Sequence, residues 1–215
     1  MTTTFKVAGL LASIASVPQG LGGAMCRAVR AMLVLLLAVG ASSASIAQQD
    51  LWKVVRERPN IVIVMRHTEV GRGNGTTFDP TGQCQGELML TSKGRAEATE
   101  IGKAFVAQGL GPDRLHVVSS AMCRNRDTAM LAFGKAELDP ALREFFSGGG
   151  GRMNEALDAA EAAVRRLRGP RPVVVLTHLP NIDAMTGEQP DHNQAVVAES
   201  DAKGQLTTLG VLRLY

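Results

Sequence analysis

The chain has 215 residues, only 4% of which are aromatic, and a formal net charge of +3. The basic excess lies in residues 1–47, which hold three Lys and Arg residues and no acidic one, so residues 48–215 carry 20 basic and 20 acidic residues. This balance excludes a broad basic face for nucleic acid, and the length suits one domain behind a targeting segment.

Residues 1–47 have the pattern of an export signal. A basic segment precedes an apolar run at 32–39, and the small-x-small pattern that ends at Ala47 marks a cleavage site with Gln48 as the first mature residue. We therefore expect a periplasmic or secreted protein with no stable membrane insertion after cleavage. Met25 is an alternative start, and an uncleaved anchor is the alternative to cleavage.

The first predicted strand covers residues 60–66, a β-branched run that stops at His67. Residues 70–90 contain too much glycine and too little periodicity for a helix or strand, so we expect a loop, and loops of this length usually have a function. A helix is predicted over 92–108, with Thr91 as its N-cap.

The second predicted strand, residues 115–120, leads directly into a helix over 123–133. A glycine at position 134 is a fitting end for this helix, because glycine adopts the left-handed conformation of a C-cap without strain. The apolar residues that we expect this helix to bury are Ala129, Met130 and Phe133.

The remaining chain alternates in the same way. Residues 138–146 are expected to hold a short strand or turn, and 148–151 a flexible joint, before the clearest helical stripe at 153–168. A buried strand at 172–177 then stops at His178. The last predicted elements are a helical turn near 181–185 and strands near 195–199 and 208–214.

Alternating strands and helices with short connections predict an α/β fold for residues 48–215: one three-layer α/β/α sandwich with a mostly parallel central sheet. The last two strands could pair antiparallel at an edge of this sheet. Ligands of open parallel sheets bind at the carboxyl ends of the strands. The residues that follow the predicted strands are therefore the candidates for a site.

Arginine and histidine side chains stand at three of these strand ends. His67 ends the first strand with Arg66 beside it, Arg124 lies in the first turn of the helix after the second strand, and His178 ends a later strand. A helix N-terminus and a guanidinium both bind phosphate oxygens, and nearby guanidinium charge keeps an imidazole neutral and therefore nucleophilic. We expect an anion site in which a histidine attacks phosphorus, without a metal or another cofactor.

In this order the motifs resemble the histidine phosphatase superfamily, phosphoglycerate mutase-like branch, across residues 60–214. The family's Arg-His-Gly opening is found at 66–68 with threonine in place of glycine, and its Ser-Ser-x-x-x-Arg-x-x-x-Thr-Ala element spans 119–129. The resemblance implies a phosphohistidine intermediate in which His67 is the nucleophile. The phosphate pocket that it implies consists of Arg66, Arg124 and His178.

The resemblance also bears on the proton donor and on the subgroup. Glu144 matches the position at which many members carry an acidic proton donor for the leaving oxygen, with Glu69, Asp79 and Asp183 as alternatives. Within the superfamily the chain is similar to small exported phosphatases and to lipopolysaccharide-core heptose phosphate phosphatases. The residues that carry this similarity are Cys84, Thr91, Gly94, Arg95, Cys123 and Arg124.

Two cysteines remain once Cys26 leaves with the export signal. Cys84 lies in the loop after the first strand, and Cys123 directly precedes Arg124. In an oxidising compartment the two can form a disulfide that ties this loop to the site, or they can remain two free thiols.

Four other polar residues lie outside the motifs or at their margins. His116 has no motif around it and is expected to be structural, whereas His192 lies in a polar loop from which it could reach the substrate. Arg95 and Arg126 are expected to be solvated helix charges.

We therefore expect a metal-independent phosphomonoesterase that acts on a small phosphorylated metabolite or envelope phosphosugar. The loops at 70–90 and 148–153 are expected to shape its specificity. A non-catalytic phosphate- or phosphoglycan-binding protein is one alternative, because Thr68 departs from the family pattern. A phosphohistidine phosphatase is the other alternative.

Overall fold

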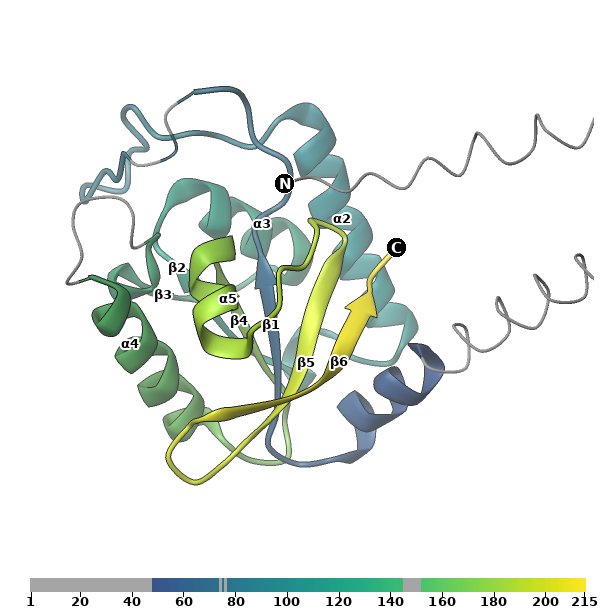
Figure 1. Ribbon diagram of the computed structural model, residues 1–215. Coiled ribbons are helices and arrows are strands. Elements are labelled where there is room, and N and C mark those ends of the chain that lie inside the picture. Colours follow the sequence, from purple (N-terminus) through teal and green to yellow (C-terminus); the bar gives the residue numbers. More distant parts are fainter. Residues whose placement is uncertain (1–47, 74, 76, 145–151) are drawn as a thin grey trace, which may run out of the picture. The chain divides into compact units, whose positions relative to one another are not determined.

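The computed structural model describes residues 48–215 except 74, 76 and 145–151 (Figure 1). The expected export signal at 1–47 and the expected joint at 148–151 therefore lie outside the described residues. Within the described part of the chain, no helix combines the length and the apolar character needed to cross a membrane.

Six strands form one central sheet: β1 (Ile61–Arg66), β2 (His116–Ser120), β3 (Glu137–Asp139), β4 (Val173–Thr177), β5 (Gln194–Ser200) and β6 (Leu206–Arg213). Their order in the sheet is β3-β2-β4-β1-β5-β6. The first four strands in this order are parallel, whereas β5 is antiparallel to β1 and β6 is antiparallel to β5. The predicted α/β fold with a mostly parallel sheet is thus confirmed.

Helices cover both faces of the sheet. The main ones are α2 (Ser92–Ala107), α3 (Cys123–Phe133), α4 (Arg152–Leu167) and α5 (Leu179–Thr186), with 3₁₀ turns η3 (Pro112–Arg114) and η4 (Pro140–Leu142) and a further helix over 48–57. One face packs against α2, α3 and the helix over 48–57, and the other face packs against α4 and α5 (Figure 1). The structure therefore has the expected three layers.

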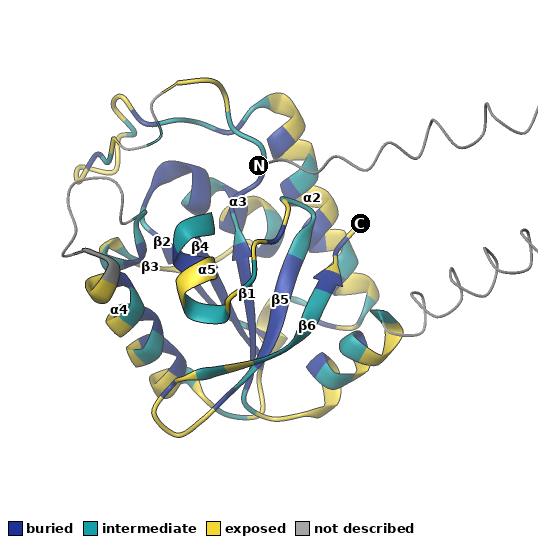
Figure 2. Cartoon of the chain, viewed as in Figure 1, coloured by how far each residue is buried: buried dark blue, intermediate teal, exposed yellow. Residues whose placement is uncertain are grey.

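The strand β1 shows why the sheet separates two apolar cores. Ile61, Ile63 and Met65 belong to the core on the side of α2 and α3, whereas Val62 and Val64 belong to the core on the side of α4. Side chains of a strand point alternately to its two faces, so a strand buried on both faces needs a continuous apolar run. Figure 2 shows the central strands buried between helices whose outer surfaces are exposed.

Helix α2 begins where its sequence predicts and packs against the segment that follows His67. Oγ1 of Thr91 accepts a hydrogen bond from the backbone N of Gly94 at 2.9 Å. A Cβ at Gly94 would lie 2.0 Å from the carbonyl oxygen of Glu69, and one at Gly102 would lie 2.3 Å from a carbonyl oxygen of α3. The two glycines therefore let α2 approach both the segment that follows β1 and α3.

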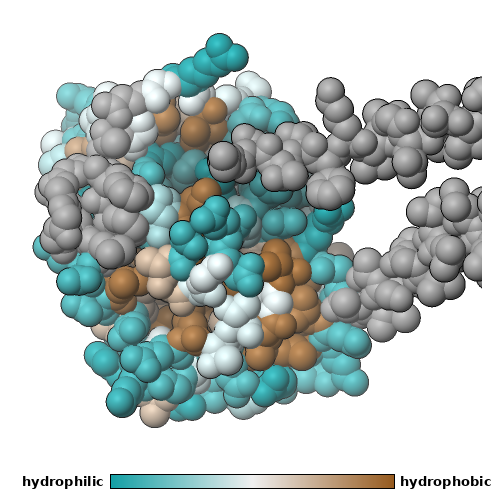
Figure 3. Space-filling model, viewed as in Figure 1, coloured by the Kyte–Doolittle hydropathy of each residue, from teal (hydrophilic) through white to brown (hydrophobic). Residues whose placement is uncertain are grey.

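A side chain caps the antiparallel edge of the sheet. Nε2 of Gln48 donates to the carbonyl oxygen of Val211 at 3.0 Å, and its Oε1 accepts from the backbone N of Arg213 at 2.6 Å. The amide thus pairs with β6 as a neighbouring strand would. Most of β6 is only partly buried, and Figure 3 shows apolar surface over this strand, so the cap protects an edge that could otherwise pair with another chain.

Two features of the layer beside α3 differ from expectation. Met130 is 47% exposed, because the packed face of α3 is defined by Ala129 and Phe133, one helical turn apart. The helix over 48–57 has no counterpart among the predicted elements. Trp52 fixes this helix by packing edge-to-face on Phe105, with ring centroids 5.3 Å apart.

Candidate active site

The carboxyl ends of three parallel strands bring the predicted site residues together. His67 follows β1 directly, Arg124 is the second residue of α3 after β2, and His178 is the N-cap of α5 after β4. The ring centroids of His67 and His178 lie 5.6 Å apart, and Nη2 of Arg124 lies 3.3 Å from Nδ1 of His178. All three side chains are buried. They meet because parallel strands end at the same edge of the sheet.

The imidazole of His67 is held by its own strand end. Nδ1 of His67 lies 2.8 Å from the carbonyl oxygen of Thr68. Because a carbonyl oxygen only accepts hydrogen bonds, this contact places the ring proton on Nδ1. The ring lone pair is then on Nε2, which is the nitrogen free to attack a substrate.

Thr68, which stands where the family pattern has glycine, is fully buried and hydrogen-bonded. Its backbone N donates to Oγ1 of Thr128 at 3.2 Å, and the two threonine hydroxyls are also 3.2 Å apart. Oγ1 of Thr128 in turn donates to the carbonyl oxygen of Arg124 at 2.7 Å. The threonine therefore connects the segment of His67 to the helix that carries Arg124.

Burial lowers the pKa of His67 to about 3, and the positive charges of Arg124 and Arg66 act in the same direction. The hydrogen bond to Thr68 favours the protonated ring but is outweighed. Burial, followed by the charge of Arg124, also holds the pKa of His178 well below its ordinary value. Both imidazoles are therefore neutral near neutral pH, as a nucleophilic nitrogen requires.

Two guanidinium groups offer hydrogen-bond donors to an anion. Nη2 of Arg124 donates to the carbonyl oxygen of Gly75 and to Oε2 of Glu144, both at 2.9 Å. Nη1 of Arg124 and Nε of Arg66 are buried and have no hydrogen-bond partner among the described residues. A buried donor without a partner costs about 1–3 kcal/mol, and an anion bound between the two guanidinium groups could satisfy such donors.

Glu144 lies beside Arg124 because the segment before it is anchored to β4 and α5. Oγ1 of Thr177 donates to the carbonyl oxygen of Leu142 at 2.9 Å, and Nδ2 of Asn181 donates to the same oxygen at 3.1 Å. With this anchor in place, the carboxylate of Glu144 reaches Arg124 while 24% of its side chain stays exposed. It is therefore both held and accessible to a leaving group.

The three alternative acids are engaged elsewhere. The carboxylate of Glu69 accepts hydrogen bonds at the start of α2, and that of Asp79 holds the loop in which it lies. Asp183 is exposed on α5 and accepts a hydrogen bond from a nearby glutamine. Among the described contacts, Glu144 is the one of these four carboxylates that touches an arginine of the pocket.

Two polar side chains behind the pocket complete its support. Oγ of Ser120 lies 3.1 Å from Nε2 of His178, and Nδ2 of Asn125 donates to the carbonyl oxygen of Thr177 at 2.6 Å. Both residues fall within the Ser-Ser-x-x-x-Arg element and its helix, so the motif also positions the second histidine. The described residues contain no group of three or more His, Cys, Asp or Glu arranged to hold a metal ion.

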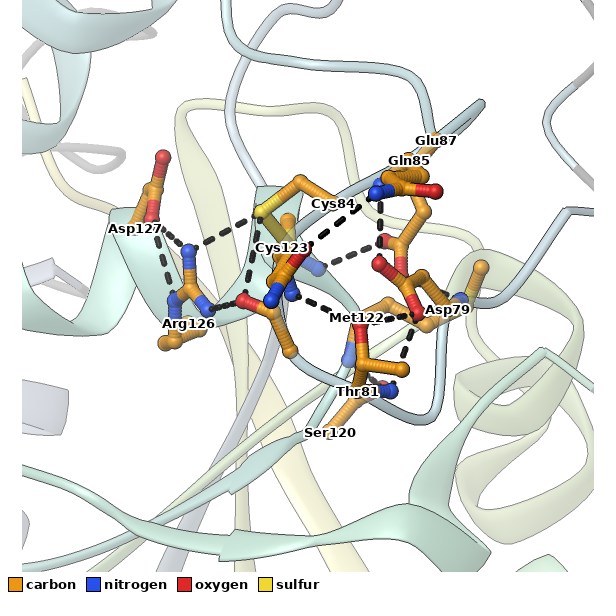
Figure 4. Close-up of a disulfide and its surroundings, with 12 residues drawn as sticks. Asp79, Thr81, Cys84, Gln85, Glu87, Ser120, Met122, Cys123, Arg126 and Asp127 are labelled. Carbon is orange, nitrogen blue, oxygen red and sulfur yellow. Dashed lines mark hydrogen bonds and ion pairs between the residues drawn. A yellow bond between two sulfur atoms is a disulfide. The ribbon is translucent and has the colours of Figure 1, made fainter.

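Cys84 and Cys123 form a disulfide that joins the loop after β1 to the first residue of α3 (Figure 4). Of the two alternatives for these cysteines, pairing is therefore confirmed. Oε2 of Glu87 accepts from the backbone N of Cys123 at 2.7 Å, and Oε1 accepts from the backbone N of Asp79 at 2.8 Å. The loop is thus tied to the residue that precedes Arg124 both covalently and by hydrogen bonds.

Arg126 is not the solvated helix charge that its position on α3 predicts. Its Nη1 donates to the carbonyl oxygen of Gly82 at 2.9 Å, and its Nη2 lies 3.1 Å from Sγ of Cys84 and 3.3 Å from the carboxylate of Asp127 (Figure 4). The disulfide brings the loop over the first turn of α3, which covers this side chain. Arg95, by contrast, is half exposed as expected.

His192 lies in a turn before β5, as expected for a loop residue, and the structure places this turn beside His67. Nδ1 of His192 lies 2.7 Å from the carbonyl oxygen of His67, and the two ring centroids are 5.7 Å apart. In the antiparallel pairing of β5 with β1, Val64 stands opposite Val196, so the residues just before β5 lie at the edge where β1 ends. Had the antiparallel direction of β5 been known, it would have placed His192 beside the end of β1.

Comparison with known proteins places the chain in a family. The model of the histidine phosphatase superfamily (branch 1) matches residues 62–170, about half of the chain. A search of curated proteins gave no significant match.

Several solved structures are similar to the chain, and the first of the following shares its fold. The product of a Mycobacterium tuberculosis open reading frame is 19% identical, with a TM-score of 0.52 over 74% of this chain and 100% of its own. The protein histidine phosphatase SixA, solved with tungstate, is 18% identical with a TM-score of 0.48 over 71% and 96%. A phosphoserine phosphatase from Entamoeba histolytica is 13% identical with a TM-score of 0.49 over 70% and 95%. At 19% identity the likeness to the Mycobacterium tuberculosis protein concerns the fold alone.

The family match and the site geometry lead to the same assignment. The matched segment begins in β1 and includes the strand end at His67 and the helix that carries Arg124. These are the elements whose motifs predict a phosphate pocket. The chain belongs to the histidine phosphatase superfamily, branch 1, and is a phosphoric monoester hydrolase with a catalytic histidine.

Proposed function

We propose that the protein hydrolyses a phosphomonoester in two steps through a phosphohistidine at His67, without a metal. The observation that carries the proposal is the neutral, buried imidazole of His67 beside two guanidinium groups, each with a buried donor that has no hydrogen-bond partner among the described residues. Arg66 and Arg124 supply positive charge to the phosphoryl oxygens in the transition state. His178, buried against Arg124, completes the phosphate pocket.

In the first step, Nε2 of His67 attacks phosphorus while the bond between phosphorus and the leaving oxygen breaks. Glu144 gives its proton to that oxygen, which leaves as an alcohol. The contact between Glu144 and Arg124 supports the placement of this group, because the guanidinium that binds the phosphoryl group also holds the carboxyl group next to it.

In the second step, Glu144 is a carboxylate and takes a proton from water as the water oxygen attacks the phosphorus of phospho-His67. The bond between nitrogen and phosphorus breaks, inorganic phosphate leaves, and His67 returns to its neutral form. The hydrogen bond from Nδ1 of His67 to the carbonyl oxygen of Thr68 keeps Nε2 as the reacting nitrogen in both steps.

The proposed substrate is a small phosphorylated metabolite or an envelope phosphosugar encountered in the periplasm or outside the cell. The export-signal pattern of residues 1–47 supports this location, and so does the Cys84–Cys123 disulfide, because disulfides persist in oxidising compartments. The similarity to heptose phosphate phosphatases supports the sugar. The loop after β1, whose Gly75 carbonyl contacts Arg124, is proposed to shape the specificity. Family membership assigns the chain to the hydrolases, so the non-catalytic alternative is not carried forward.

The test is the release of phosphate from para-nitrophenyl phosphate in the presence of EDTA by the wild type, His67→Ala and His116→Ala. His116 is the matched control, because it is a histidine at the amino end of β2, away from the strand ends that form the pocket. We expect turnover that survives EDTA, persists in His116→Ala and vanishes in His67→Ala. Equal turnover in His67→Ala and wild type would overturn the assignment of the nucleophile.

A substrate screen then separates the remaining classes. Envelope phosphosugars and a phosphohistidine peptide are compared by their kcat/KM values with the same protein. Preference for the sugars supports the proposal, whereas preference for the peptide favours a phosphohistidine phosphatase. An acid-labile phosphoryl label that is trapped on the wild type and not on His67→Ala would identify the intermediate directly.

A further inference from the structure

One contact at the nucleophile comes from outside the family motifs. Nδ1 of His192 lies 2.7 Å from the carbonyl oxygen of His67, and the two rings are tilted by 48°. Because the carbonyl oxygen only accepts, Nδ1 of His192 is the donor. The imidazole of His192 therefore holds the main chain of the residue whose side chain reacts.

The contact lies where the strand pairing stops. The ladder between β1 and β5 runs from the pair Ile61–Glu199 to the pair Val64–Val196, and His67 lies three residues beyond it. A backbone carbonyl that is removed from water needs a hydrogen-bond partner. The side chain of His192 supplies that partner where the neighbouring strand no longer does.

The peptide unit between His67 and Thr68 is held at both of its polar groups. Its carbonyl oxygen accepts from His192 at 2.7 Å, and its N–H donates to Oγ1 of Thr128 at 3.2 Å. Two opposed hydrogen bonds fix the rotation of a peptide plane, and this plane starts at the Cα atom that carries the His67 side chain. Loss of either bond would free the plane and change the direction of the imidazole.

The turn that carries His192 is itself rigid enough to hold this carbonyl. The backbone N of Gln194 donates to the carbonyl oxygen of Asp191, and the backbone N of Asp191 donates to Oε1 of Gln194, both at 3.0 Å. The backbone N of Leu214 donates to the carbonyl oxygen of Asn193 at 2.9 Å. The ring of His192 is therefore presented by a turn that is anchored on both sides.

We propose that His192 is a positioning residue for phosphoryl transfer, which holds the main-chain carbonyl of His67 and thereby aligns the reactive imidazole. The inference rests on the proposed function of His67 as the nucleophile. His192 forms no bond to phosphorus in this scheme and acts through His67. Its removal should therefore affect the chemical steps more than substrate binding.

The kinetic test compares His192→Leu with His192→Asn. Leucine fills similar space without a donor, whereas Nδ2 of asparagine can take the place of the imidazole Nδ1–H. We expect His192→Leu to lower kcat by about 10–100-fold with little change in KM, because small misplacements of a reacting group have effects of this order. His192→Asn should keep most of the wild-type kcat. Equal losses in both variants, in step with their Tm values, would overturn the proposal in favour of a merely structural role.

A second readout does not depend on turnover. In protein labelled with ¹⁵N-histidine, the ring signals of His67 should show one Nδ1–H tautomer in the wild type and in His192→Asn. In His192→Leu we expect a tautomer mixture or exchange broadening, and His192→Ala replaces this variant if it does not fold. Unchanged His67 signals in the variant without a donor would overturn the positioning role. If the wild type showed no turnover, the proposed function would fail. The ring signals of His67 would still show whether His192 positions this imidazole.

Discussion

The parallel and the antiparallel parts of the sheet supply residues to the same site in opposite ways. In the parallel part, β3-β2-β4-β1, the side chains come from residues that follow strand ends, namely His67, Arg124 and His178. In the antiparallel part, β5 runs in the reverse direction and contributes His192, which precedes its start. Parallel strands end at one edge of this mixed sheet, and the antiparallel strand β5 starts at the same edge. The direction of a strand therefore determines whether the residues after it or those before it reach the site.

The two parts also differ in how they are reinforced. In the parallel part, the disulfide between Cys84 and Cys123 ties the loop after β1 to the first residue of α3, directly before Arg124. The antiparallel part relies on backbone pairing and on the amide of Gln48 at its edge. We therefore expect damage to the parallel part to cost more stability and more activity than damage to the antiparallel part.

Removal of the disulfide by Cys84→Ser together with Cys123→Ser should have the largest effect. The bridge spans a sequence separation of 39 residues. The chain-entropy relation for a loop of this length corresponds to about 4 kcal/mol of unfolding free energy. Urea unfolding of wild type and variant measures the loss, and wild type reduced with dithiothreitol should match the variant. No measurable loss would show that the hydrogen bonds of Glu87 hold the loop without the bridge.

Arg124→Ala tests the parallel part at the site itself. We expect kcat/KM to fall by about 10²–10³-fold, as for removal of one preorganised donor to a transition state. Arg213→Ala, on the exposed edge strand β6, is the matched control and should leave kcat/KM unchanged. Similar losses of kcat/KM in the two variants would contradict the expectation that damage to the parallel part costs more activity.

Glu144→Gln should lower kcat by about 10²-fold or more for an alkyl phosphate, whose leaving oxygen needs a proton. The loss should be much smaller for para-nitrophenyl phosphate, because nitrophenolate leaves without one. Steady-state kinetics with both substrates measures the difference, and Asp183→Asn on α5 is the control. Equal losses for both substrates would argue against Glu144 as the proton donor.

Acidification should destabilise the fold through the buried histidines of the parallel part. The pKa of His67, about 3, and that of His178 both lie below the ordinary value of 6.5. At pH values between the folded and the ordinary pKa, the unfolded chain therefore binds more protons than the folded protein. Stability is therefore lost as the pH falls from 6.5 towards the folded pKa values. For His67 the loss between pH 6.5 and pH 5 is about 1.5 kcal/mol, and His178 contributes in the same direction.

Comparison of the wild type with His178→Gln isolates one of these contributions. Urea unfolding at pH 6.5 and pH 5 gives the loss for each protein, and the variant should lose measurably less unfolding free energy than the wild type, because the pKa of His178 is lowered in the folded protein. A change in stability that the substitution causes equally at both pH values cancels in the difference between the two losses. Identical losses would show that His178 has the same pKa in the folded and the unfolded chain, which would contradict the lowering of its pKa by burial.

Much of the fold could be predicted because its signals are local. The β-branched runs became β1 and β4, helix α3 spans the predicted 123–133, and Thr91 caps α2 as its side chain suggests. The motif arginines and histidines follow these strands and therefore meet at one edge. Each of these features depends on residues that are neighbours along the chain.

The remaining features could not be predicted because they depend on contacts between distant segments. Met130 is exposed and Arg126 is covered because of what packs against α3, namely α2 on one side and the disulfide-linked loop on the other. The helix over 48–57 is held by Trp52 on Phe105 rather than by a strong periodic pattern of its own. A local pattern does not specify such partners.

The sequence by itself determined the strand and helix patterns, the ordered phosphatase motifs and hence the class of fold and the family. Only the tertiary structure decided that Cys84 pairs with Cys123, that Glu144 contacts Arg124, and that His192 holds the carbonyl of His67. The physical reason is that secondary structure and motifs follow from interactions over a few residues. A contact such as that between His67 and His192, by contrast, depends on the order and direction of strands, which emerge only when the whole sheet is assembled.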